Sequence, residues 1–163
     1  MRLTVPTSMR WSDLDAYGHV NNVSMLRFFE EARVHAFWRT TEYTEASVAP
    51  PIDDSMAVLD GSTGDETMMV IARMSVEYLV SIPYVRRPLD IELWIGHLGG
   101  ASLEVFYEVW SPKGDEPRTL FTRASTTLVL VDTASQRPRR MTEAERAAWV
   151  LYTDEPVVFS SRR

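Results

Sequence analysis

The sequence contains no cysteine. This absence excludes disulfide bonds, cysteine nucleophiles and thiolate metal sites, and it agrees with a reducing compartment. Apolar stretches long enough to cross a bilayer are also lacking, and the first residues, MRLTVPTSMRWSD, have no apolar signal-peptide core. We therefore predict a cytoplasmic protein that does not act at a membrane.

Positive charge is scarce as well. Lysine and arginine number 17 against 23 aspartates and glutamates, which gives a formal net charge of −6. Because a sequence-independent nucleic-acid binder carries a basic face, we predict no nucleic-acid partner. Basic residues do gather locally at Arg86-Arg87 and at Arg137, Arg139 and Arg140. These arginines are either solvated loop charges or contacts for an anionic group of a small ligand, and the sequence leaves both interpretations open.

The motifs of several catalytic classes are missing. The chain has no G-x-S-x-G elbow, no H-E-x-x-H, no P-loop and no G-x-G-x-x-G before a helix. It has three histidines, His19, His35 and His97, and no spacing suggests three converging metal ligands, so we predict no metal site. His35 and His97 are interpreted as surface or core residues.

Length and composition predict one domain, residues 1–163. With 163 residues, 45% of them apolar, the chain can bury a core without covalent staples. Apolar residues at three- and four-residue spacing predict a long helix from Asn22 to about Thr40. The other elements expected from periodicity and turn residues are a short strand at 4–12, an irregular connection at 41–65 that forms a lid or pocket wall, strands near 68–80, 89–95, 103–109 and 120–131, a polar break at 136–138, and a helix at 142–152.

Finer patterns support these elements. Every even residue from Met68 to Val80 is apolar or aromatic, which is the alternation of a half-buried antiparallel strand. Gly99-Gly100 predicts a hairpin turn, and Thr142 with Glu145 forms a capping box at the start of the last helix. One wide apolar helix against one face of an antiparallel sheet indicates the α+β class.

The densest polar cluster lies in RWSDLDAYGHVNN, residues 10–22, where a strand leads into the long helix. A helix N-terminus presents unpaired amides that can bind a developing oxyanion, and Gly18 lets the backbone approach a ligand closely. The carboxylate of Asp15 could act as nucleophile or as base toward water, which fits acyl transfer at an activated ester. The alternative is structural: Asp15 makes an Asx turn, Gly18 supplies a turn, and Asn21 or Asn22 caps the helix.

The string DLDAYGHVNN, followed by a helix containing FFEEAR, resembles the hotdog-fold thioesterases of the 4-hydroxybenzoyl-CoA thioesterase-like group. It is most similar to the acyl-acyl-carrier-protein thioesterase branch, whose junction reads D-L-D-x-N-x-H-V-N-N. A weaker similarity follows at residues 77–93. The resemblance implies a hotdog fold, in which a long central helix is wrapped by a five- to six-stranded antiparallel sheet.

The resemblance also implies roles for single residues of the junction. Asp15 matches the catalytic aspartate, and His19 matches a histidine that orients the thioester or stabilises charge near it. The amides of Gly18 to Val20 would form the oxyanion hole, with Gly18, His19 and Val20 counted as catalytic positions. Asp13 is expected to be structural or solvated. The paired asparagines, Asn21 and Asn22, would organise the loop and helix start, and Tyr17 stands where the plant-type enzymes have an asparagine. All three are expected to be substrate-binding positions.

The implied activity is hydrolysis of acyl-CoA or acyl-carrier-protein thioesters without a cofactor. The acyl chain would lie against Phe28, Phe29 and side chains of a partner subunit, and Arg86 and Arg87 would contact CoA phosphates. Because one chain holds one hotdog unit, the resemblance implies a homodimer joined through sheet edges, or a tetramer of such dimers. Two alternatives stay open: a hotdog hydratase or dehydratase, which lacks its second Asp/His motif here, and a non-catalytic acyl-CoA binder, which would not need the acid at position 15.

Overall fold

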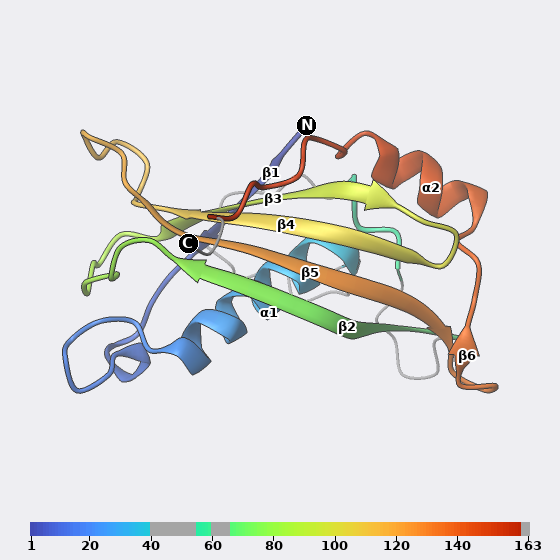
Figure 1. The fold of residues 1–163 in the computed structure, drawn as a ribbon, viewed down its shortest axis with the longest axis horizontal. Helices are drawn as coiled ribbons and strands as arrows, with labels where there is room; N and C mark the ends of the chain where they lie inside the picture. Colours follow the sequence, from blue (N-terminus) through green and yellow to red (C-terminus); the bar gives the residue numbers. More distant parts are fainter. Residues whose placement is uncertain (40–54, 60–65, 161–163) are drawn as a thin grey trace.

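One antiparallel sheet and a helix across its face make up the fold in the computed structural model, which describes residues 1–39, 55–59 and 66–160. The sheet has six strands in the order β1-β3-β4-β5-β2, with β6 paired to β5 (Figure 1). The strands are β1 (Leu3–Thr7), β2 (Thr67–Tyr78), β3 (Leu89–Leu98), β4 (Ser102–Trp110), β5 (Leu120–Asp132) and β6 (Arg137–Pro138). The helices are α1 (Asn22–Phe37), α2 (Glu143–Val150) and a single 3-10 turn, η1 (Trp11–Asp13). The predicted α+β class is confirmed.

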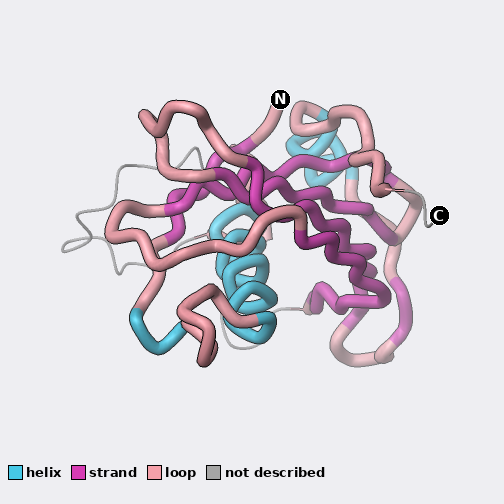
Figure 2. The backbone as a smooth tube through the Cα atoms, turned by 60° about the vertical axis from the view of Figure 1, so that its left-hand side comes forward, coloured by secondary structure: helices cyan, strands magenta, loops and turns pink. Residues whose placement is uncertain are grey.

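Helix α1 lies on one face of the sheet, as the turned view in Figure 2 shows. It begins where predicted, because the Asn21 side chain accepts a hydrogen bond of 2.8 Å from the amide of Ser24 and so caps the helix. It ends at Phe37 rather than Thr40, with sixteen residues, so the predicted long central helix is confirmed only in part. The side chains buried toward the sheet include Met25, Phe28, Phe29, Ala32, Ala36 and Phe37.

The core-facing rows of the central strands follow the predicted alternation. In β3 and β4 every second residue is at most 1% exposed: Leu89, Ile91, Leu93, Ile95, Leu103, Val105, Tyr107 and Val109. The turn between the two strands closes where two glycines predicted it, with the amide of Gly99 donating to the carbonyl of Ser102 at 2.7 Å. These rows meet α1 directly, since the rings of Phe29 and Tyr107 lie 4.9 Å apart.

Strand β2 departs from the prediction of one continuous alternation. A bulge between Ile71 and Arg73 adds a residue relative to β5 and shifts the register. Because side chains in a strand alternate between faces, the extra residue moves the helix-facing set from odd positions before the bulge to even positions after it. No residue of β2 is buried, which agrees with its place at the edge of the sheet.

Three smaller predictions are corrected or completed. The first strand ends at Thr7 instead of continuing to residue 12, because residues 11–13 form η1. The polar break at 136–138 contains β6. Helix α2 has its capping box, with the Glu145 amide donating to Thr142 Oγ1 at 3.2 Å, and it ends at Val150. Of the irregular connection predicted at 41–65, the structure describes only residues 55–59, and the rest lies outside the described residues.

Membrane-spanning helices are not found in the described part of the chain, because none of its helices is long and apolar enough.

Candidate active site

The junction between β1 and α1 folds as a tight loop. Leu14 and Val20 pair as an isolated bridge, and the amide of Asp15 donates to the carbonyl of His19 at 2.8 Å. The loop turns at Gly18, whose φ of 77° lies in the left-handed region that residues with a Cβ rarely adopt. The local sequence therefore determines this geometry, and it brings residues 15 and 19 to the same rim.

Asp15 anchors this loop with one of its carboxylate oxygens. Its Oδ1 accepts hydrogen bonds from the amides of Tyr17 at 2.8 Å and His19 at 3.1 Å. The structural alternative, an Asx turn, is thus present. The second oxygen accepts no hydrogen bond from the described residues, and the side chain is exposed. One carboxylate therefore holds the loop and still offers a free oxygen to a ligand.

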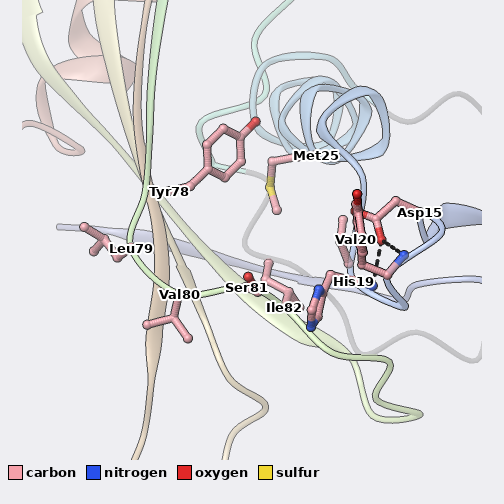
Figure 3. A pocket seen from close by; sticks show the side chains of 10 residues that line it. Asp15, His19, Val20, Met25, Tyr78, Leu79, Val80, Ser81 and Ile82 are labelled. Carbon is pink, nitrogen blue, oxygen red and sulfur yellow. Dashed lines mark hydrogen bonds between the residues drawn. The ribbon is translucent and has the colours of Figure 1, made fainter.

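A cavity of about 440 Å³ lies between this loop and the end of β2 (Figure 3). The junction contributes Asp15, Tyr17, His19 and Val20, and helix α1 contributes Met25. The opposite wall is formed by residues 78–82. The lining combines apolar side chains with a few polar groups, which is typical of small-molecule sites.

His19 lines the cavity, but its ring is not joined to Asp15 by a hydrogen bond within the described residues. Only the backbone amide of His19 reaches the carboxylate, and its backbone pairs with Pro83 as an isolated bridge. The two side chains are therefore separate groups on one rim. Asp15 is not oriented by an imidazole as it would be in a hydrogen-bonded catalytic dyad.

The amides that the resemblance implies as oxyanion donors are already occupied. The amide of Gly18 donates to the carbonyl of Asp15, and the amide of His19 donates to the carboxylate of Asp15. The amide of Val20 donates to the carbonyl of Ile82. The amides of Asn22 and Val23, the first two of α1, find no acceptor in the described residues, because the Asn21 cap pairs with Ser24 and Met25 instead. The unpaired donors are therefore the amides of residues 22 and 23 instead of those of 18–20, and neither Asn22 nor Val23 is among the residues that line the cavity.

Asp13 is structural, as expected, and is not solvated. It is 1% exposed and accepts hydrogen bonds from the amide of Arg10 at 2.6 Å, from Ser24 Oγ at 3.3 Å and from the guanidinium of Arg27. The carbonyl of Asp13 also accepts from the amide of Asn21 at 2.9 Å. The first aspartate of the motif therefore fastens the loop to the first turns of α1.

The predicted substrate contacts are only partly brought together. Tyr17 lines the cavity and is 85% exposed, whereas Phe28 and Phe29 are buried in the core and do not line it. Arg86 and Arg87 are exposed and lie outside the lining. Arg87 is held by the carboxylate of Asp115 and donates to the carbonyl of Lys113 at 3.3 Å.

Met25 and the whole opposite wall of the cavity, residues 78–82, escaped the sequence prediction. Tyr78 projects from the end of β2 toward α1, on the side of the cavity opposite Asp15 (Figure 3), and its hydroxyl donates a hydrogen bond to Asn22 Oδ1. Burial raises the pKa of its phenol. No group of three or more histidines, aspartates or glutamates with the spacing of a metal site occurs among the residues that the structure describes.

The family of the protein follows from its similarity to known proteins. Residues 9–150 match the sequence profile of the thioesterase-like superfamily. The chain belongs to this superfamily. Its fold agrees with that of a predicted thioesterase from Bacillus stearothermophilus, with a TM-score of 0.69 and 19% identity over 96% of this chain and all of that one. It also agrees with a thioesterase from Thermus thermophilus complexed with coenzyme A and zinc, with a TM-score of 0.65 and 24% identity over 95% and 96% of the two chains.

A curated relative of this thioesterase-like protein is YsmA of Bacillus subtilis (strain 168), an uncharacterised protein. The two are 29% identical over 101 residues, which cover 61% of this chain and 55% of YsmA. The chain thus spans about half the length of that relative. The structural agreement establishes the hotdog architecture for this superfamily member, and the predicted fold is confirmed.

Proposed function

We propose that this superfamily member is an acyl thioesterase that hydrolyses acyl-CoA to a free acid and CoA. The observation that carries the proposal is Asp15, which lines a cavity of about 440 Å³, keeps one carboxylate oxygen without a hydrogen bond from the described residues, and lies in the loop that leads to the unpaired amides at the start of α1. Membership in the thioesterase-like superfamily supports the reaction class.

The reaction needs an attack on the thioester carbon and a site for the resulting oxyanion. If Asp15 attacks directly, the carbon–sulfur bond breaks, the thiolate takes a proton from solvent, and water hydrolyses the acyl–Asp15 anhydride to the free acid. If Asp15 acts as a base, it takes a proton from the attacking water and returns it to the thiolate as the carbon–sulfur bond breaks. The amides of Asn22 and Val23, at the positive end of the helix dipole, would hold the oxyanion. His19, on the same rim, would orient the thioester or stabilise charge near its sulfur.

Coenzyme A is the favoured thiol carrier, because the Thermus thermophilus thioesterase of the same fold was crystallised with it. An acyl-carrier protein remains the other candidate. Of the two predicted phosphate contacts, Arg86 is the better one, since it is exposed and forms no ion pair within the described residues, whereas Arg87 is engaged by Asp115.

Replacing Arg86 should therefore weaken the binding of acyl-CoA. We expect Arg86→Ala to raise the KM for acyl-CoA about fivefold, the effect of losing one exposed ionic contact of about 1 kcal/mol. The KM for the corresponding acyl-pantetheine, which lacks the nucleotide, should stay unchanged. Arg146→Ala, which alters an exposed arginine on α2, serves as the matched control, and an equal rise of both KM values in the Arg86 variant would contradict a phosphate contact.

We also propose that the protein is a homodimer, or a tetramer of dimers, joined through β2. Within the residues that the structure describes, no strand pairs with the outer edge of β2, where Val70 and Ile71 are 45% and 46% exposed, and such edges invite pairing with another strand. Sedimentation should give a multiple of the 18.6 kDa chain, and Ile71→Lys should lower it; a monomeric wild type contradicts this assembly.

The activity itself is tested by thiol release from acyl-CoAs that range from acetyl to palmitoyl, with benzoyl-CoA included. The proposal expects steady turnover of at least one member of the panel, and the preferred member defines the acyl group. If the protein binds acyl-CoA but releases no thiol from any of them, it is a non-catalytic binder and the proposal is wrong.

A further inference from the structure

Tyr78 occupies a position that connects the edge of the sheet to the start of α1. It is the last residue of β2, it lines the cavity, and its hydroxyl donates to Asn22 Oδ1. Asn22 is the first residue of α1, and its backbone amide is one of the two unpaired donors at the helix start. The strand thus holds the side chain of the residue whose amide would bind the oxyanion in the proposed reaction.

The bulge in β2 is what turns Tyr78 toward the helix. After the bulge, Val76 and Tyr78 pair with Ala124 and Thr122, which are fully buried on the core face of β5. Without the extra residue, the alternation of the strand would direct position 78 to the opposite face. A local irregularity, which the alternation of the sequence does not reveal, therefore places a phenol at the cavity.

In the part of the chain that the structure describes, the hydrogen bond between Tyr78 and Asn22 has no second side-chain hydrogen bond beside it. Within the described residues it is the one side-chain hydrogen bond between β2 and α1, since the other polar side-chain contacts of α1 go to Asp13 and to Tyr107 of β4. The helix packs mainly on the opposite part of the sheet, against β1 and β3. Two backbone contacts also cross the cavity, from the amide of Val20 to the carbonyl of Ile82 and between His19 and Pro83, but both precede the helix. Tyr78 is the side chain of β2 that reaches α1 itself.

We propose that Tyr78 is a positioning residue that holds Asn22, and with it the oxyanion-binding amides, at the correct distance from Asp15. This inference rests on the proposed thioesterase function and deepens it. The phenol need not contact the substrate or transfer a proton. Tyr78 is 51% exposed, and the partial burial of its phenol raises the pKa, so the hydroxyl stays protonated and able to donate at neutral pH.

The kinetic test is a double-mutant cycle of Tyr78→Phe, Asn22→Ala and the double variant, assayed with the preferred acyl-CoA. Each single change should lower kcat about tenfold with KM within about twofold, as expected when reacting groups are slightly misplaced. The double variant should be no slower than the slower single variant, because both changes remove the same link. Tyr84→Phe, which alters an exposed tyrosine outside the cavity lining, is the control and should keep its kcat.

A second readout does not depend on catalysis. Amide resonances and hydrogen exchange of Asn22 and Val23 should change in Tyr78→Phe, while amides of the β3–β4 hairpin stay as in the wild type. The inference is overturned if these amides are unaffected, if Tyr78→Phe keeps its kcat, or if the two single effects multiply in the double variant. Absence of thiol release from the wild type, with the amide changes present, would instead reject the proposed function and leave the tether established.

Discussion

Asp15→Asn should lose about a hundredfold or more in kcat, the usual cost of removing a principal acid–base group. The change removes the charge and the basic oxygen, but the amide oxygen of asparagine can still accept from the amides of Tyr17 and His19. The loop should therefore survive, and the KM for acyl-CoA should stay within about threefold if the ground-state contacts are kept. Thiol release and thermal unfolding on the same preparation measure both effects.

Two further variants separate chemistry from structure. Asp15→Ala removes the Asx turn together with the base, so it should be as inactive as Asp15→Asn and less stable in addition. Asp132→Asn alters a carboxylate that holds a turn by accepting from the amide of Ser135 at 2.7 Å, far from the cavity lining, and it should keep full activity. Wild-type kcat in a folded Asp15→Asn protein would show that this carboxylate only shapes the loop.

Asp13→Ala should lower the free energy of unfolding by about 3 kcal/mol, because it leaves buried donors without an acceptor. The carboxylate is 1% exposed and accepts from a main-chain amide, a hydroxyl and a guanidinium that belong to separate segments of the junction. Urea-induced unfolding with an unchanged m-value would measure the loss. Activity should fall too, since the loop that carries Asp15 is fastened to α1 through this residue.

The partners of Asp13 provide the comparison. Arg27 is 45% exposed in its side chain, so Arg27→Ala should cost about 1 kcal/mol or less, as for other exposed ion pairs. Asp13→Asn, which retains an acceptor, should fall between the two. If Arg27→Ala and Asp13→Ala were equally destabilising, the ion pair rather than the buried hydrogen bonds to the backbone would hold the junction.

Local patterns predicted the elements whose structure is determined locally. The Asn21 cap, the Thr142–Glu145 capping box and the turn at Gly99 each depend on residues a few positions apart, and all three are confirmed. The bulge in β2 is different. It is defined against β5, more than fifty positions away, and the even-numbered apolar residues from Met68 to Val80 give no sign of it.

The same distinction explains which parts of the site were found. Asp15, Tyr17 and His19 are close in sequence, and the loop brings them to one rim. Tyr78 and Ile82 lie more than fifty positions further along the chain than the motif, so the motif does not reveal the opposite wall of the cavity. Nor does it reveal that the amide of Val20 donates to the carbonyl of Ile82. Phe28 and Phe29 fit the helical stripe, but spacing does not distinguish a core face from a ligand-binding one.

The most direct test of the central claim is a crystal structure of Asp15→Asn with an acyl-CoA analogue in which the thioester sulfur is separated from the carbonyl by a methylene group. We expect the carbonyl oxygen to lie within hydrogen-bond reach, about 3 Å, of the amides of Asn22 and Val23, with the side chain of residue 15 facing the carbonyl carbon. An analogue bound with its carbonyl away from the start of α1, or outside the cavity lined by residues 15 and 78, would contradict it.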